Sequence, residues 1–171
     1  MKLQQYGLQR TGTNALKALV EHNLSGASVD PAGKHDMPAG EADGYLISVK
    51  DPASWVWSNY RYRKLKYSHQ KPPVDVVFDA GFVTDCLAYW EAHTLACLSL
   101  AASHPDRVVV VQHERLLRDP GAVLEQVRAT LGLDYSDRPR NLFERGYARR
   151  GDGTLSGADL IDPARRFDRG Y

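Results

Sequence analysis

The sequence contains few cysteines, and their placement excludes two common structural roles. Its 171 residues include 2 cysteines, Cys86 and Cys97, which fall in one predicted helix. Helical rise separates them by roughly 16 Å, whereas a disulfide requires Cα atoms within about 7 Å of each other. A zinc site would need clustered cysteines or histidines, and neither thiol lies in such a cluster. We therefore expect two unpaired core thiols and no metal.

Long hydrophobic runs and targeting signals are also missing. No apolar stretch reaches the length of a membrane span, and residues 1–6 lack the hydrophobic core of a signal peptide. Internal repeats and low-complexity tracts are absent as well. These absences predict a cytoplasmic protein that does not contact a membrane.

Neither sign of charge dominates the sequence. Lys and Arg number 22 and Asp and Glu number 21, which gives a formal net charge of +1. This balance excludes a strongly basic nucleic-acid coat, so we expect no nucleic-acid partner, but it is compatible with a local anion site. With 43% hydrophobic and 25% charged residues, the composition is that of an ordinary globular protein, and the length suits one domain spanning residues 1–171.

Short apolar strands alternate with helical segments along the chain. Strands are predicted at residues 3–8, 27–29, 45–49 and 107–112, and helices at residues 13–22, 51–67, 82–103 and 120–131. This alternation predicts an α/β fold with a mostly parallel sheet flanked by helices. The helix at 82–103 is apolar on more than one face, which predicts a core helix. Residues 134–171 are rich in Arg and Gly and predict a loop-rich C-terminal segment.

A glycine-punctuated loop connects the first predicted strand to the first predicted helix. Gly7 and Gly12 have the spacing of a phosphate-binding loop, whose backbone N–H groups and helix N-terminus bind anions. A nucleoside-triphosphatase loop would continue with Lys and a magnesium-binding hydroxyl. Here Thr13 and Asn14 follow, and Arg10 lies inside the loop. The loop therefore suits an anionic group but not metal-assisted phosphoryl transfer, and a tight turn without a ligand is the alternative.

A second potential anion site follows the strand at residues 45–49. Lys50 ends this strand, Asp51 and Pro52 begin the next helix, and Ser58 lies about two turns into it. Ligands of open α/β sheets bind at the carboxyl ends of the strands, so a strand-end cation and a helical hydroxyl can converge on one phosphate. Taken alone, however, these two residues favour a solvated lysine and a serine on the helix surface.

The two segments together resemble the nucleotide-binding signatures of sulfotransferases that use 3'-phosphoadenosine 5'-phosphosulfate. Residues 10–13, Arg-Thr-Gly-Thr, resemble the family loop that holds the 5'-phosphosulfate, and Lys50 with Ser58 resembles the Arg and Ser that hold the 3'-phosphate. Residues 112–120 and 131–133 resemble two later family segments in the same order. The resemblance implies a P-loop-NTPase-like sulfotransferase fold, with this nucleotide as the co-substrate.

The resemblance also implies a set of nucleotide-binding residues. The set comprises Gln9, Arg10, Thr11, Gly12, Thr13, Asn14, Lys50, Ser58, Arg149, Arg150 and Gly151. Its last three members resemble a late family loop that closes over the 3'-phosphate, and a charged, solvated turn is the alternative. The chain departs from the family at Ala15, where many members have a Trp that stacks on adenine, and at Lys50, which lacks the bidentate fork of Arg. Adenine must then be held by another group.

A histidine between the two anion sites is the candidate catalytic base. Transfer of a sulfonate to a hydroxyl or amine needs a base for the acceptor proton and cations for the charge that develops on the leaving phosphate. Among the 6 histidines, His35 is favoured because the Lys34-His35 segment resembles the family's Lys-x-His-x-Pro motif. Lys34 and Arg10 are the candidate cations, and their positive charges favour the neutral form of the His35 imidazole, which can accept a proton. Glu114 is the alternative base, whereas His93, inside the apolar helix, is expected to be a core residue.

The acceptor is not identified by the sequence. A basic run interleaved with tyrosines follows the second anion site and comprises Arg61, Arg63, Lys64, Lys66, His69 and Lys71. It is compatible with binding of an acidic small molecule or glycan and equally with a solvated helix face. We expect a sulfotransferase that acts by in-line displacement. The alternatives are a small nucleotide or sugar kinase, which the missing loop Lys disfavours, and a non-catalytic nucleotide-binding module.

Overall fold

The computed structural model describes residues 1–68 and 75–137, and the predicted alternation of strands and helices is present there. The elements are β1 (Lys2–Tyr6), α1 (Thr13–Asn23), β2 (Ser28–Asp30), β3 (Gly44–Val49), α2 (Pro52–Ser68), α3 (Ala80–Ser103), β4 (Val108–Gln112), α4 (His113–Arg118) and α5 (Pro120–Leu131). Each predicted element is found with small shifts at its ends. The six-residue helix α4 was not predicted, because so short a segment shows no helical period.

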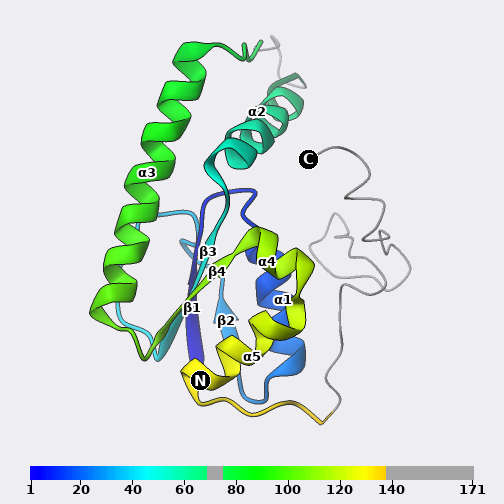
Figure 1. Ribbon diagram of the computed structural model, residues 1–171, viewed down its shortest axis with the longest axis vertical. Helices are drawn as coiled ribbons and strands as arrows, with labels where there is room; N and C mark the ends of the chain where they lie inside the picture. The colour runs from blue at the N-terminus through cyan, green and yellow to red at the C-terminus, as the bar shows by residue number, and fades with distance from the viewer. Residues whose placement is uncertain (69–74, 138–171) are drawn as a thin grey trace.

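The four strands form one parallel sheet in the order β2-β1-β3-β4. β1 lies between β2 and β3, with Leu3 opposite Gly44, and β3 pairs with β4, with Tyr45 opposite Val108. Because all strands run the same way, their carboxyl ends lie at the edge opposite the chain's N-terminus in Figure 1. The α/β class with a parallel sheet flanked by helices is thereby confirmed, and the segments that follow the four strands all begin at one edge.

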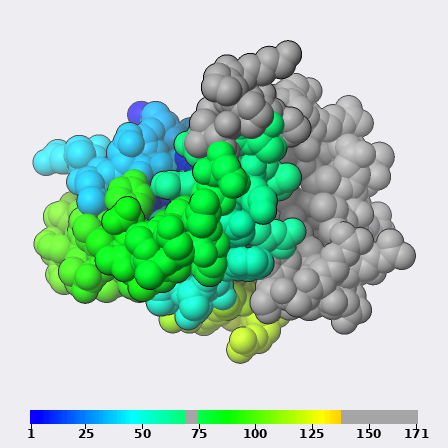
Figure 2. All heavy atoms as spheres, turned by 90° about the horizontal axis from the view of Figure 1, so that it is seen from above, coloured from blue at the N-terminus to red at the C-terminus, as the bar shows by residue number. Residues whose placement is uncertain are grey.

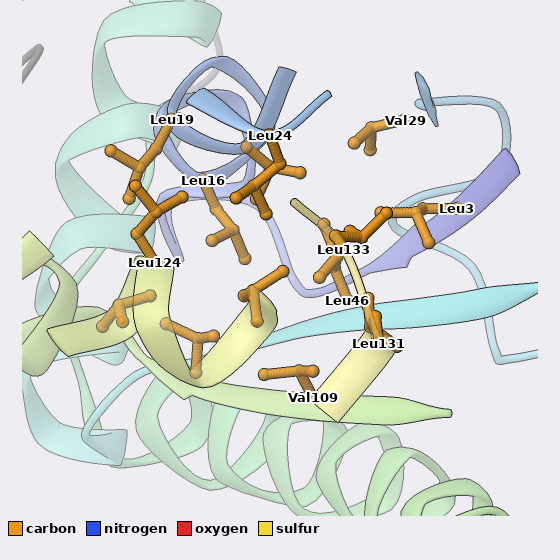
Figure 3. Packing of buried hydrophobic residues seen from close by; sticks show 14 of the residues in the cluster. Leu3, Leu16, Leu19, Leu24, Val29, Leu46, Val109, Leu124, Leu131 and Leu133 are labelled. Carbon is orange, nitrogen blue, oxygen red and sulfur yellow. The ribbon is translucent and has the colours of Figure 1, made fainter. Parts of the chain in front are cut away.

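One face of the sheet is covered by helices α1 and α5 (Figure 1). The core on this side is almost purely aliphatic, and Leu16, Leu46 and Val109 are each at most 1% exposed. Figure 3 shows leucines of α1 and α5 pointing toward each other above the sheet. Burial of each such side chain stabilises the fold by about 1.5–3 kcal/mol before conformational entropy is counted, so this layer is the main support of the fold.

The opposite face of the sheet carries aromatic and polar side chains under α3. Tyr6, Tyr45, Ile47 and Cys97 are buried here, and the two tyrosine rings stack with their centroids 6.4 Å apart. Helix α2 packs beside α3 near the carboxyl edge of the sheet (Figure 1). A second cluster, Leu8, Trp55, Val56 and Cys86, fills the space between these helices and the loop after β1.

Helix α3 is much more exposed than its sequence predicts. Its apolar composition predicts a core helix, but only Cys86, His93 and Cys97 are buried among its side chains, and Leu95 is 59% exposed. The sheet and α2 contact one side of α3, and no element in residues 1–68 and 75–137 covers the other side. Both cysteines are buried and unpaired, as predicted.

Two Asp-Pro pairs begin helices as the sequence indicates. The Ser54 amide donates a hydrogen bond of 2.8 Å to Oδ1 of Asp51, before Pro52 opens α2. Asp119 accepts in the same way from the Ala122 amide at 2.9 Å, before the proline that opens α5. An acceptor at this position satisfies an amide that the helix cannot, which typically stabilises it by about 1 kcal/mol.

The outer edge of β4 has no strand partner within the described part of the chain. The Tyr45 amide donates to the Arg107 carbonyl, so carbonyls at alternate positions point away from β3, including that of Val110. Nε2 of Gln126, from α5, donates a long hydrogen bond of 3.4 Å to this outward carbonyl. Arg115 in turn donates to Oε1 of Gln126 at 3.0 Å. Side chains thus cover the middle of this edge.

No helix in the described ranges is both long enough and apolar enough to cross a membrane. The predicted loop-rich segment at 134–171 is described only as far as residue 137. There Leu24 forms an isolated antiparallel bridge with Tyr135, which ties the end of α1 to the chain that follows α5. The rest of that segment lies outside the described residues.

Candidate functional site

Residues 7–12 link β1 to α1 at the carboxyl edge of the sheet. Arg10 has a φ of 72°, a conformation that residues other than glycine rarely adopt, and Gly12 begins α1 with a φ of 82°. Thr11 is buried, and its hydroxyl donates to the Leu8 carbonyl at 2.7 Å. The Arg10 side chain is exposed at the tip of this turn. The loop therefore presents its cation outward from a strained backbone, a feature that often marks binding sites.

The two loop glycines allow close approach of neighbouring groups. A Cβ on Gly7 would lie 2.7 Å from the Ser48 carbonyl oxygen, and a Cβ on Gly12 would lie 2.5 Å from Nδ1 of His113. The first turn of α1 has no acidic residue, and no side chain caps it. The partial positive charge of this helix N-terminus, which includes Thr13 and Asn14, is therefore not offset by a carboxylate in that turn.

Helix α2 holds the loop from its other side. Nε1 of Trp55 donates to the Gln9 carbonyl at 2.8 Å, and the indole is 2% exposed. The Arg10 guanidinium lies over the Tyr62 ring, 5.8 Å from its centroid. The hydrogen bond between Trp55 and Gln9 was not predicted from the sequence. No local signal was available, because the two partners are 46 residues apart.

Lys50 and Ser58 meet at the end of β3, as their spacing predicts. Nζ of Lys50 lies 3.0 Å from Oγ of Ser58, and the two side chains are 8% and 7% exposed. Burial lowers the pKa of Lys50, nearby Glu114 opposes that shift, and Arg10 lowers the pKa further. The neighbouring parallel strands β1 and β3 bring the two cations to the same edge of the sheet, where their positive charges repel each other. An anion between them would relieve this repulsion, so the arrangement favours binding of a negatively charged group.

His35 lies against the start of the loop after β1. Its Nδ1 is 2.7 Å from the Gly7 carbonyl, and the Gly7 amide donates to the Lys34 carbonyl at 2.8 Å. A carbonyl can only accept, so Nδ1 of a neutral ring must carry the proton here, and the lone pair is on Nε2. Nζ of Lys34 donates to Oδ1 of Asn14 at 2.5 Å. The structure thus brings the candidate base and its neighbouring lysine to the candidate anion loop.

A groove of about 690 Å³ lies between α3 and the ends of β3 and β4. Trp90, Leu98 and Val110 form apolar parts of its wall, and Lys50 and Glu114 lie at its charged end. Nε1 of Trp90 donates to the Lys50 carbonyl at 2.9 Å, which fixes the indole. This groove was not predicted from the sequence, because it arises where α3 covers only part of its face of the sheet.

Glu114 connects the ends of two strands. Its Oε1 accepts a hydrogen bond of 3.3 Å from the Asp51 amide, which joins the start of α2 to the start of α4. This contact gives Glu114 a structural role. Nε2 of His35, by contrast, has no hydrogen-bond partner within residues 1–68 and 75–137. His93 is a buried core residue, 3% exposed, as predicted.

The basic run on α2 lies beside the loop. The described basic residues of this run are all exposed: Arg61, Arg63, Lys64 and Lys66. Nζ of Lys66 lies over the rings of Tyr62 and Tyr67, at 5.8 and 5.6 Å from their centroids. These cation–π contacts fit both a solvated face and a rim for an acidic acceptor. His69 and Lys71 lie outside the described residues.

The predicted site residues that the structure describes all lie at this edge of the sheet. Arg149, Arg150 and Gly151 lie outside the described residues. Within residues 1–68 and 75–137, no group of three or more His, Cys, Asp or Glu side chains is arranged to hold a metal ion. The described site is therefore a cationic one, built from Arg10, Lys34 and Lys50 around a neutral hydroxyl and an imidazole.

No protein-family model matches the chain, and no curated protein matches its sequence. What is established is the class: an α/β protein with a four-stranded parallel sheet flanked by helices. A function has to be inferred from the chemistry at the carboxyl edge of that sheet.

Proposed function

We propose that this chain is a sulfotransferase that transfers the sulfonate of 3'-phosphoadenosine 5'-phosphosulfate to a hydroxyl or amine of an acceptor. The observation that carries the proposal is the buried, hydrogen-bonded Lys50–Ser58 pair at the end of β3, at the same sheet edge as the loop after β1 that presents Arg10. One cation belongs to the loop after β1 and the other to the end of β3. A nucleotide with phosphates on both its 5' and 3' positions matches two such sites.

The donor set at the edge fits this co-substrate. The loop offers the helix N-terminus and an exposed guanidinium, which suit the 5'-phosphosulfate. Lys50 and Ser58 offer an ammonium and a hydroxyl, which suit a single phosphate. When bound, the co-substrate supplies the sulfonate group and a bisphosphate leaving group.

His35 would act as the general base of this reaction. With Nδ1 directed at the Gly7 carbonyl, Nε2 can take the proton of an acceptor hydroxyl or amine. Arg10 and Lys34 would stabilise the charge that develops on the leaving phosphate. The hydrogen bond between Lys34 and Asn14 holds that lysine beside the first turn of α1, where the phosphosulfate is proposed to bind.

A calorimetric titration with three nucleotides tests the proposal. We expect adenosine 3',5'-bisphosphate to bind without metal, and AMP and ATP–Mg²⁺ to bind at least tenfold more weakly. The Lys50→Met variant is expected to lose most of the preference for the bisphosphate, whereas the control Lys2→Met, at the opposite edge of the sheet, keeps it. Stronger binding of ATP–Mg²⁺ would indicate a kinase instead.

A transfer assay then separates an enzyme from a binding protein. The sulfonate donor is incubated with a panel of phenols, alcohols, amines and glycans, and release of the bisphosphate is measured. Acceptor-dependent release in the wild type, and its loss in His35→Ala, is the expected result. Tight bisphosphate binding without release for any acceptor would leave a non-catalytic nucleotide-binding module.

A further inference from the structure

Three buried side chains, Tyr6, Tyr45 and His93, form hydrogen bonds to the segment that carries His35. Residues 31–43 connect β2 to β3 and cross the face of the sheet on the side of α3. Tyr6 uses its hydroxyl to accept from the Ala39 amide at 3.0 Å and to donate to the Ala39 carbonyl. The Tyr45 hydroxyl accepts from the Ala42 amide and donates to the Gly40 carbonyl, each at 3.0 Å. Both tyrosines therefore act on the C-terminal half of this segment.

His93 of α3 is the third of these side chains and lies nearest to His35. Its Nε2 is 3.2 Å from the Asp36 carbonyl, one residue after the candidate base. Figure 2 shows the residues that follow β2, in light blue, beside α3 in green. His93 thus contacts the part of the segment that the two tyrosines do not reach.

The hydrogen bonds of His93 fix which ring nitrogen carries the proton. The Asp36 carbonyl can only accept, so Nε2 must donate to it, and Nδ1 of the neutral ring is then an acceptor. Sγ of Cys97 lies 3.6 Å from this Nδ1. Burial raises the pKa of the Cys97 thiol to about 11, so the thiol keeps its proton and donates it to Nδ1. A chain of two hydrogen bonds runs from Cys97 through His93 to the backbone of the His35 segment.

The neutral state of His93 follows from the same surroundings. Burial lowers the pKa of His93, the hydrogen bond to Asp36 opposes this shift, and the nearby His35 lowers the pKa further. Burial and the neighbouring imidazole of His35 both disfavour a positive charge on His93. The ring therefore serves as a neutral donor of fixed orientation, and not as a second base.

We propose that His93 is a positioning residue that seats the His35 segment through its hydrogen bond to the Asp36 carbonyl. The consequence for catalysis rests on the proposed function. His93 contacts neither the loop after β1 nor Lys50 in the hydrogen bonds described. Loss of its donor is therefore expected to displace the base without weakening the nucleotide site, and small displacements of a catalytic group can cost about 100-fold in rate.

Amide hydrogen exchange measures how firmly His93 holds residues 33–42, and it does not require the protein to be active. In His93→Phe, which keeps an apolar ring but no donor, amides in residues 33–42 are expected to exchange at least tenfold faster than in the wild type. His93→Gln keeps an N–H donor and is expected to retain most of the protection. Val123→Ala, a core change on the other face of the sheet, is the control for general destabilisation and should not single out residues 33–42.

A milder variant covers the case in which His93→Phe does not fold. Cys97→Ala removes the donor to Nδ1 and frees the ring to change tautomer. It is expected to loosen residues 33–42 by an intermediate amount. Unchanged exchange in that segment in whichever of these variants folds overturns the proposal, whatever the protein catalyses.

Turnover supplies the readout that a purely structural role would not change. In His93→Phe, kcat is expected to fall at least tenfold while KM for the nucleotide changes less than about twofold, and His93→Gln is expected to restore most of kcat. Faster exchange at 33–42 with unchanged kcat overturns the positioning role. If the wild type transfers no sulfonate but His93→Phe still loosens residues 33–42 selectively, the seating is supported and the proposed function fails.

Discussion

The two faces of the sheet differ in chemistry and in coverage. Under α1 and α5 the core is almost purely aliphatic, and two buried polar side chains of the strands, Gln5 and Ser48, lie near the carboxyl edge beside the loop. Under α3, buried tyrosines and His93 hydrogen-bond to a surface segment, and an open groove remains beside β4. The first face gains stability from close packing. On the second face, hydrogen bonds that orient the backbone of the His35 segment take the place of part of that close packing.

This difference predicts which substitutions affect stability and which affect function. Aliphatic residues under α1 and α5 have no contact with the candidate base, so their removal should lower the free energy of unfolding alone. Residues at the carboxyl edge carry the charges of the candidate site, and residues under α3 form hydrogen bonds to the segment that carries His35. Their substitution should change binding or turnover more than stability.

The largest effect is expected from His35→Ala. General base catalysis typically contributes about 10²- to 10⁴-fold, so kcat should fall within that range while bisphosphate affinity stays nearly unchanged. Steady-state kinetics and calorimetry measure the two quantities. His22→Ala, a histidine at the end of α1, serves as the matched control and should leave kcat unaltered. A His35→Ala variant with wild-type turnover would remove His35 from the mechanism.

The second-largest effect is expected at Lys50, whose ammonium loses hydration because it is buried. In Lys50→Met the bisphosphate affinity should fall about 10- to 100-fold, as expected for loss of a charge-assisted contact, and the affinity for AMP should change less. Relief of desolvation offsets the lost hydrogen bond to Ser58, so the urea midpoint should shift little. Equal loss for nucleotides with and without a 3'-phosphate would contradict the assigned position.

A pair of neighbouring valines on β4 tests the two faces directly. Val111 is 1% exposed in the aliphatic core, whereas Val110 is half-buried and lines the groove. We expect Val111→Ala to lower the free energy of unfolding by about 2 kcal/mol and Val110→Ala by less than about 1 kcal/mol. Urea unfolding of both variants measures the difference. Equal losses would show that the groove side is packed as closely as the other.

The smallest effect is a pH dependence of stability that comes from His93. Burial lowers its pKa in the folded state below the ordinary value of 6.5. Between the lowered pKa and 6.5 the unfolded chain binds a proton that the folded chain excludes, so stability falls as the pH drops below about 6.5. Urea midpoints at pH 5, 6 and 7 should therefore vary less in His93→Gln than in the wild type. The His22→Gln control should keep the wild-type slope.

Local patterns in the sequence were sufficient for the elements and their order. The four consecutive valines of β4 and the two Asp-Pro pairs carry strong local signals, and the parallel sheet follows from the alternation. The same logic placed Lys50 and Ser58 together, because strand ends share an edge and a helical spacing fixes the hydroxyl. His35 was expected between the two anion sites, but its contact with the Gly7 carbonyl was not predicted.

Features that depend on distant partners could not be predicted. The hydrogen bonds of Trp55 to Gln9 and of His93 to Asp36 join residues 46 and 57 positions apart, and no local period encodes them. The exposure of α3 was predicted wrongly, because apolar composition shows which faces can be buried and not which faces have a neighbour. The tautomer of His35 also required the position of the Gly7 carbonyl.

The side chains along the outer edge of β4 affect how molecules of this protein meet at high concentration. An unpaired strand offers a template to which a strand from another molecule can add, the first step toward fibrils. At Val110 an incoming strand would have to displace Gln126, which Arg115 also holds. The Gln126 side chain therefore hinders sheet extension within the run of four consecutive valines, where self-association would otherwise begin most readily.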